Sequence, residues 1–119
     1  MANILVIDDE GAIVRLVQKM LSGAYTLASA RDGASGLAHV IAHRPDVVIV
    51  DSDLPRIDGA EVCRRIKASP ETAHIAVVLM TPNYVDFFAA QPAFEPNAVL
   101  IRPFTRETLQ NTVARVLTR

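Results

Sequence analysis

The chain has 119 residues, half of them apolar, and a formal net charge of −1 from 12 basic and 13 acidic residues. This length and apolar fraction predict one folded domain with its own core and exclude an intrinsically disordered chain. The balanced charge does not indicate direct binding to nucleic acid or to an anionic membrane, and the single Cys63 excludes an internal disulfide.

In the first half of the chain, strand and helix patterns alternate. Their order is strand 3–7, helix 10–21, strand 25–30, helix 33–43 and strand 47–50. Gly23 is the expected end of the first helix, because glycine commonly follows the last helical turn. The predicted buried face of the second helix consists of Ala34, Leu37, Ala38 and Ile41, which follow helical spacing.

The second half continues the alternation. Its order is helix 58–68, strand 75–80, a short helix 83–91, strand 98–101 and a last helix capped by Thr105. Strands that are apolar throughout are typical of a parallel sheet covered on both faces. We therefore predict an α/β fold, a (βα)₅ doubly wound parallel sheet in a flavodoxin-like three-layer sandwich, formed by a single domain over residues 1–119.

Membrane insertion is not expected. The longest uninterrupted apolar run, Ile75–Met80, is too short to cross a bilayer, and a strand that starts at residue 3 leaves no room for a signal peptide. We therefore expect a cytoplasmic protein. The sequence does not distinguish a stand-alone domain from one excised from a longer protein.

Chemically active side chains follow four of the predicted strands. Asp8 and Asp9 follow the first strand, Asp51 the third, Thr81 the fourth and Arg102 the fifth. With the strand order 2-1-3-4-5, a crevice opens at the carboxyl ends of strands one and three. We therefore expect three carboxylates to meet there, with a hydroxyl and a cation beside them.

Clustered carboxylates repel one another unless a cation joins them. Mg²⁺ prefers oxygen ligands and retains several waters, so it suits a small acidic pocket that is open to a phosphate group. A hydroxyl donor and a cation are what a phosphoryl group needs opposite the metal. Each residue also has a simpler interpretation: Asp9 as a helix N-cap, Thr81 as a strand terminator and Arg102 as a solvated charge.

At these residues the sequence resembles the receiver domain of two-component response regulators, of the kind found in chemotaxis. The resemblance spans the whole chain. It is carried by the segments "ILVIDDE" (4–10), "DVVIVDSDLPRIDG" (46–59), "VVLMT" (77–81) and "IRPF" (101–104).

The resemblance implies a role for each matching position. Asp51 is the expected phospho-acceptor, which takes a phosphoryl group from a phosphohistidine of a sensor histidine kinase or phosphotransfer protein. Asp8 and Asp9 are the expected metal-binding acids, and Asp51 and the backbone carbonyl of Asp53 complete the protein ligands of Mg²⁺. Thr81 is the expected switch hydroxyl. The protein would then signal to a downstream effector or a fused output domain and would not be an enzyme with an external substrate.

Three positions depart from the family pattern. Arg102 replaces the family lysine, and this exchange changes a compact charge into a planar, bidentate donor. Val99 stands where the family has a switch aromatic, and Pro82 follows the threonine. At the two positions that tune the phosphoryl lifetime, the chain has Asp53 and Asn83.

These departures keep a second hypothesis open: a degenerate receiver that binds partners independently of phosphorylation. A third is a phosphatase of the haloacid-dehalogenase type, in which the spacing of Asp51 and Asp53 supplies a nucleophile and a general acid. That family normally carries this motif on its first strand and has further motifs. The cognate kinase, the output partner and the oligomeric state leave no signal in the sequence.

Overall fold

The computed structural model describes residues 1–83 and 95–118. Its strands are β1 (Asn3–Ile7), β2 (Thr26–Ala30), β3 (Val47–Asp51), β4 (Ala76–Thr81) and β5 (Ala98–Ile101). Its helices are α1 (Gly11–Leu21), α2 (Gly33–His43), α3 (Gly59–Ala68) and α5 (Arg106–Leu117). The predicted helix over 83–91 falls almost entirely outside the described residues.

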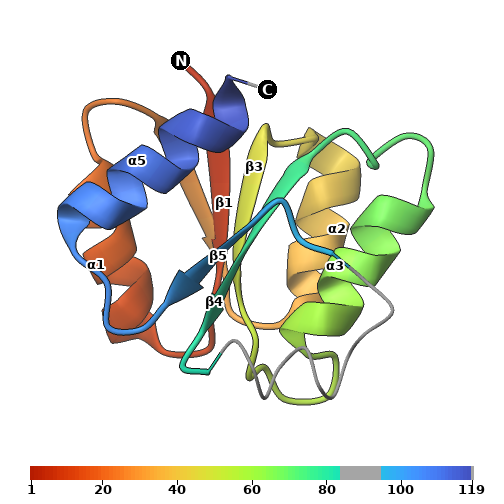
Figure 1. The fold of residues 1–119 in the computed structure, drawn as a ribbon. Helices are drawn as coiled ribbons and strands as arrows, with labels where there is room; N and C mark the ends of the chain where they lie inside the picture. Colours follow the sequence, from red (N-terminus) through yellow and green to blue (C-terminus); the bar gives the residue numbers. More distant parts are fainter. Residues whose placement is uncertain (84–94, 119) are drawn as a thin grey trace.

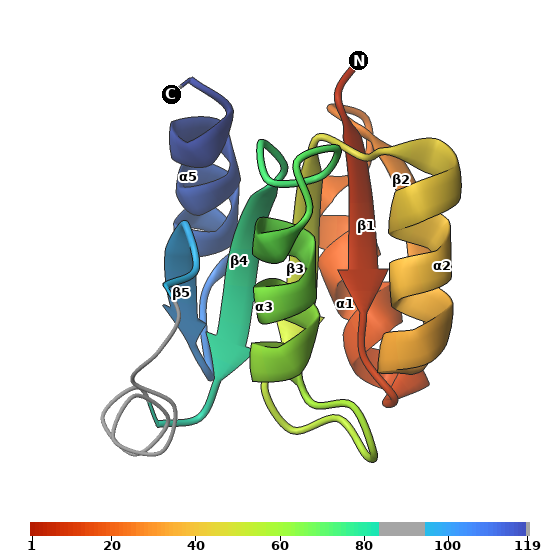
Figure 2. The ribbon, with the colours of Figure 1, turned by 90° about the vertical axis from the view of Figure 1, so that its right-hand side faces the viewer.

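The strands form one parallel sheet in the order β2-β1-β3-β4-β5. Helices α1 and α5 cover one face of this sheet and α2 and α3 cover the other (Figures 1 and 2). The register places Ile7, the last residue of β1, beside Ala30 of β2 and Val50 of β3, so the strands end at a common edge. The predicted three-layer, doubly wound fold is confirmed.

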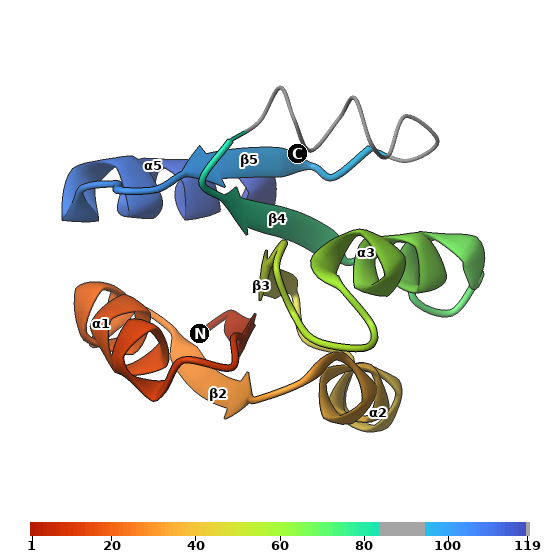
Figure 3. The ribbon, with the colours of Figure 1, turned by 90° about the horizontal axis from the view of Figure 1, so that it is seen from below.

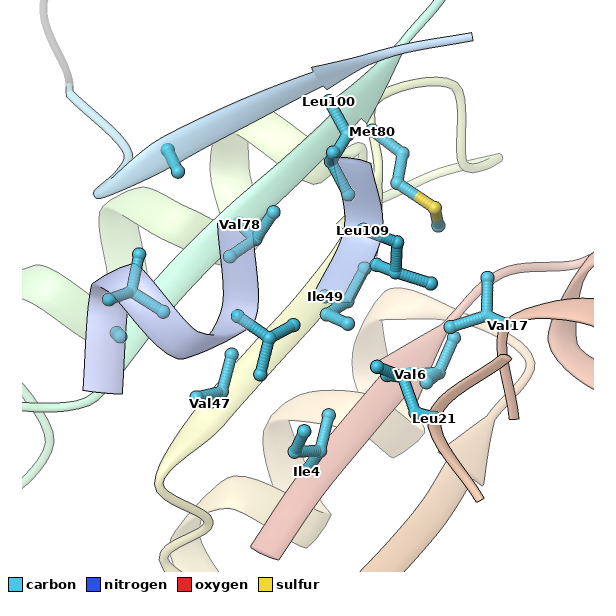
Figure 4. Packing of buried hydrophobic residues seen from close by; sticks show 14 of the residues in the cluster. Ile4, Val6, Val17, Leu21, Val47, Ile49, Val78, Met80, Leu100 and Leu109 are labelled. Atoms are coloured by element: carbon cyan, nitrogen blue, oxygen red, sulfur yellow. The ribbon is translucent and has the colours of Figure 1, made fainter. Parts of the chain in front are cut away.

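Among the described residues, the core consists of two hydrophobic clusters, one on each face of the sheet. Successive residues of a strand point to opposite faces, so Val6 and Ile49 pack toward α1 and α5 whereas Ile7 and Val50 pack toward α2 and α3. Figure 4 shows the first cluster, with Leu109 of α5 over the strands. Because both faces are covered, the strands need no polar alternation, and this explains their continuous apolar sequences.

Polar side chains cap the N-termini of α2, α3 and α5. The Thr105 hydroxyl accepts a hydrogen bond from the backbone N–H of Thr108 at 3.1 Å, as predicted for the cap of α5. Asp32 and Asp58 cap α2 and α3 in the same way. After α1, Gly23 has a positive φ of 87°, a conformation that glycine adopts without steric cost.

The predicted buried face of α2 was wrong. Gly33, Gly36 and Val40 are buried, whereas Ile41 is 66% exposed. The reason is the close approach of the helix to the sheet: a Cβ at Gly36 would lie 2.9 Å from Cγ1 of Ile7. Two glycines therefore form the contact face, and the larger Leu37 is left at its margin.

Within residues 1–83 and 95–118, no helix combines the length and the apolar character that a membrane crossing requires. Cys63 of α3 is fully buried in the second cluster, and burial raises the pKa of its thiol to about 11. A buried, protonated thiol acts as a small apolar side chain. Cys63 therefore contributes to the packing of α3 against the sheet.

Candidate functional site

The candidate site lies at the edge of the sheet where the parallel strands end, which Figure 3 shows from below. Asp8 directly follows β1, and Asp51 is the last residue of β3. The pairing of Ile7 with Val50 sets these two acids side by side at the point where the strand order reverses. The location is therefore a consequence of topology and register.

The three carboxylates at this edge are close enough to share one ion. Asp8, Asp9 and Asp51 each offer an oxygen, and these oxygens all lie within 4.8 Å of one another. Asp8 is fully buried and Asp51 is 2% exposed, whereas Asp9 is exposed. The cluster thus has a buried floor and one side open to solvent.

Asp8 is oriented by the backbone but only half satisfied. Its Oδ1 accepts a hydrogen bond from the backbone N–H of Glu10 at 2.9 Å. Its Oδ2 is buried and has no hydrogen-bond partner among residues 1–83 and 95–118. A buried carboxylate oxygen without a donor is costly, and a bound cation would remove that cost. This oxygen and the all-carboxylate donor set fit a hard divalent ion such as Mg²⁺.

Arg102 reaches into the acidic cluster from the end of β5. Its Nη2 donates a hydrogen bond to Oδ1 of Asp51 at 2.8 Å, and its side chain is 21% exposed. The backbone N–H of Arg102 also donates to the carbonyl of Thr81 at 3.0 Å, which fixes the start of this loop on β4. The interpretation of Arg102 as a merely solvated charge is therefore wrong.

The cluster disfavours ionisation of its buried acids. Burial raises the pKa of Asp51 to about 6, the Asp8 charge adds to this rise, and the Arg102 guanidinium opposes it. Burial also raises the pKa of Asp8, against the hydrogen bond from the Glu10 amide. A cation at the site would favour the ionised form of both acids.

Thr81 ends β4 and is 2% exposed. Its hydroxyl lies 3.3 Å from the backbone nitrogen of Asn83, from which it accepts a hydrogen bond. Asp53 is exposed, and its backbone N–H lowers the pKa of Asp51. The structure therefore brings Arg102 into contact with Asp51, keeps Thr81 at the neighbouring strand end and leaves the side chain of Asp53 in solvent.

Two residues at the site were not predicted from the sequence. Gly59 lies against the backbone that carries the acceptor: its N–H donates to the carbonyl of Ser52 at 3.2 Å, and an added Cβ would collide with the carbonyl of Asp51. The Ser52 hydroxyl is buried and has no hydrogen-bond partner in the part of the chain that the structure describes. The Asp58-Gly59 pair ahead of a helix was the available signal for a close approach of this kind.

Asp9 is not the N-cap of the first helix. Glu10 occupies that position, and its side chain makes no capping hydrogen bond. Asp9 is instead held near the site by a long contact from Nη1 of Arg31 to its backbone carbonyl at 3.4 Å. Its carboxylate lies within the acidic cluster, so the capping interpretation is replaced by membership of that cluster.

Comparison with known proteins identifies the family of this chain. The family model of the response regulator receiver domain matches residues 4–114. The chain belongs to this family. As a receiver domain of two-component systems, it is a member of a family of phospho-acceptors.

Individual relatives support the same family. Over 81 residues the chain is 43% identical to the response regulator PleD of Caulobacter vibrioides, and this alignment covers 67% of this chain and 18% of PleD. Over 118 residues it is 32% identical to the response regulator MprA of Mycobacterium ulcerans, and this alignment covers 98% of this chain and 50% of MprA. The chain thus spans half or less of the length of these two relatives.

A solved structure of the same family has a similar fold. The receiver domain protein of Clostridium thermocellum has a TM-score of 0.90 and 28% sequence identity, with 100% of this chain and 96% of that chain covered. This structural match supports the same fold and the same family.

Proposed function

We propose that Asp51 accepts a phosphoryl group from the phosphohistidine of a sensor histidine kinase or phosphotransfer protein. The observation that carries this proposal is the cluster of three carboxylates at the edge where the strand order reverses, in which one buried Asp8 oxygen has no partner among the described residues. Phosphoryl transfer requires positioning and neutralisation of charge, and this edge of the sheet supplies both.

In the proposed step, a carboxylate oxygen of Asp51 attacks the phosphorus in line with the nitrogen of the donor imidazole. The new P–O bond forms as the P–N bond breaks, and the electron pair of that bond returns to the imidazole nitrogen, which then takes a proton from solvent. The product is an acyl phosphate on Asp51.

Asp8, Asp9, Asp51 and the backbone carbonyl of Asp53 would hold Mg²⁺ in this reaction. When bound, the ion supplies charge neutralisation for the phosphoryl oxygens. The protein contributes the fixed backbone of two parallel strands, which keeps the carboxylates in place. The hydrogen bond from the Glu10 amide to Asp8 orients one of them before the ion arrives.

Arg102 and Thr81 would respond to the new charge. A phosphoryl group adds about −1.5 to −2 at neutral pH, so the guanidinium that now contacts Asp51 gains a stronger acceptor. The Thr81 hydroxyl would exchange its weak contact with Asn83 for a phosphoryl oxygen. Such a rearrangement can bias a surface between two states.

We further propose that residues 1–119 form one receiver domain, either a stand-alone protein or part of a longer regulator. It would act in the cytoplasm on a downstream effector or a fused output domain. The domain would assist its own phosphorylation and dephosphorylation and would not turn over an external substrate. Asp53 and Asn83 would modify the lifetime of the acyl phosphate.

Incubation with acetyl phosphate and Mg²⁺, followed by intact-mass measurement, tests the proposal. We expect one added phosphate, which is lost in Asp51→Asn and when EDTA replaces Mg²⁺. Asp53→Asn, which keeps the backbone carbonyl, serves as the matched control and should still be phosphorylated. An adduct that persists in Asp51→Asn would refute the assignment of the acceptor.

A second candidate is a degenerate receiver that binds partners without phosphorylation. It is favoured by Val99, a half-buried aliphatic residue at the position where the resemblance predicts a switch aromatic. Without a ring to rotate, movement of Thr81 has no such partner. This candidate predicts equal affinity for an output partner with and without beryllofluoride, whereas a switch predicts a difference of about tenfold, or about 1.4 kcal/mol.

A further inference from the structure

Two histidines form a pair on α2, remote from the acidic cluster in the fold. His39 and His43 are four residues apart, so they lie on the same face of the helix in successive turns. Their ring centroids are 4.4 Å apart, with the ring planes tilted by 40°. Two imidazoles at this helical spacing are the arrangement that places both on one metal ion in helical zinc motifs.

The pair faces a cavity. A pocket of about 290 Å³ lies between the C-terminal half of α2 and the first residues of β1 and β2, and both histidines line it. Asn3 and Thr26, which are register partners at the start of their strands, also line it. The pocket therefore lies at the opposite end of the strands from Asp8 and Asp51.

The local electrostatics suit a cation. His39 is half-buried, and its burial, followed by the neighbouring His43, lowers its pKa, which favours the neutral imidazole that binds metals. His43 lies in the last turn of α2, where the partial negative charge of the helix end attracts a bound cation. The Asp46 carboxylate accepts a hydrogen bond from the backbone N–H of Asn3 at 2.7 Å, so an acid adjoins the pocket.

Arg44, the C-cap residue of α2, is directed away from the histidine pair. The guanidinium of Arg44 donates to the carbonyls of Ile41 and Glu71, at 3.1 and 2.8 Å. Arg44 and Glu71 line a separate groove between α2 and α3. Its hydrogen bonds therefore engage Arg44 outside the histidine pocket.

We propose that His39 and His43 form a two-imidazole site for a late first-row divalent ion such as Zn²⁺, Ni²⁺ or Cu²⁺, with water as the remaining ligands. Imidazole suits these ions, whereas Mg²⁺ prefers oxygen. The two sites therefore select different metals at opposite ends of the sheet. This inference depends only on the histidine pair and its pocket, so it stands or fails independently of the phosphorylation proposal.

Ni²⁺ is the probe for the test. The untagged chain is first saturated with Mg²⁺ to occupy the carboxylates, and NiCl₂ is then titrated while binding heat and amide NMR line broadening are recorded. We expect one Ni²⁺ per chain, with broadening centred on α2 and the start of β1 and β2. His39→Gln and His43→Gln should each weaken binding by about tenfold or more, since even the loss of an outer-shell partner costs roughly 10–100-fold.

His74 provides the matched control, because it is the third histidine of the chain and is exposed in the loop before β4. His74→Gln should bind Ni²⁺ as the wild type does. His39→Phe keeps an aromatic ring against His43 but removes the ligand nitrogen, so it separates ring packing from metal binding. Its circular dichroism spectrum and metal-free melting temperature report whether the fold is kept.

Three outcomes would overturn the proposal: wild-type affinity in both glutamine variants, an equal loss in His74→Gln, or broadening centred on the acidic cluster despite saturating Mg²⁺. Retention of Ni²⁺ by a folded His39→Phe would overturn it as well. A specific loss in both single variants, with His74→Gln unchanged, would support it.

Discussion

Replacement of Asp51 by asparagine tests the electrostatics of the site through protein stability. Burial raises the pKa of Asp51 to about 6 in the folded protein, against an ordinary value of 3.8. The unfolded chain exposes the carboxyl group to water and restores the ordinary value. Between these two pH values the folded state binds more protons than the unfolded state, so the free energy of unfolding falls as the pH rises.

The difference between the folded pKa of about 6 and the ordinary pKa of 3.8 corresponds to a destabilisation of the folded protein by about 3 kcal/mol. This destabilisation is present in full above about pH 6 and absent below pH 3.8. Asparagine has no charge to bury. We therefore expect Asp51→Asn to be more stable than the wild type by up to about 3 kcal/mol near pH 7.5, and by about 1 kcal/mol near pH 4.5. Loss of the contact with Arg102 reduces both gains.

Urea denaturation in EDTA, followed by circular dichroism at both pH values, measures these differences. Asp53→Asn is the control: this exposed acid should change stability by less than about 0.5 kcal/mol at either pH. Mg²⁺ at about 100 times its dissociation constant should then stabilise the wild type by about 2.7 kcal/mol, and Asp51→Asn by less. A stability difference between Asp51→Asn and wild type that does not change with pH would refute the reasoning.

Further substitutions test separate contacts. Gly59→Ala should destabilise the protein by about 1–3 kcal/mol and slow phosphorylation, because the new Cβ would lie 2.8 Å from Cα of Ser52 and displace the backbone of the acceptor; urea midpoints and intact mass would detect both effects. Thr105→Ala should cost about 1 kcal/mol in a urea titration at any pH, since an uncharged hydroxyl caps α5. Arg102→Ala should raise the pKa of Asp51 in a carbonyl NMR titration, because the guanidinium lowers it, and Arg102→Lys should largely retain the wild-type value. An unchanged titration in Arg102→Ala would contradict the ion pair.

Most of the sheet could be predicted because its strands are buried on both faces. The predicted strand 47–50 differs from β3 only by Asp51, and 98–101 coincides with β5. Continuous β-branched sequences leave few alternatives to a central parallel strand. The buried face of α2 could not be predicted in this way, because Gly33 and Gly36 are buried by shape complementarity with the sheet and carry no hydrophobic signal.

The positions of the acids could be predicted in the same way, since a carboxylate after a buried strand must lie at the edge of the sheet. Asp8 and Asp51 needed only the strand order to be brought together. The contact of Arg102 with Asp51 depends on the path of the long Arg102 side chain. The sequence therefore indicated only that Arg102 lies at the same edge of the sheet as Asp51. The approach of Gly59 to Ser52 depends on how the loop after β3 folds back, which no local pattern encodes.

The topology that creates the site also makes it costly. A parallel sheet covered on both faces withdraws the ends of its central strands from water, so acids placed there lose solvation as the core forms. Asp8 and Asp51 bear that cost, and the ion pair between Asp51 and Arg102 offsets it only in part, because the pKa of Asp51 stays raised. The remaining imbalance favours any cation or phosphoryl–cation pair that enters the crevice. The buried acids thus lower the stability of the free protein, and the same unfavourable burial strengthens binding of the groups that the reaction requires.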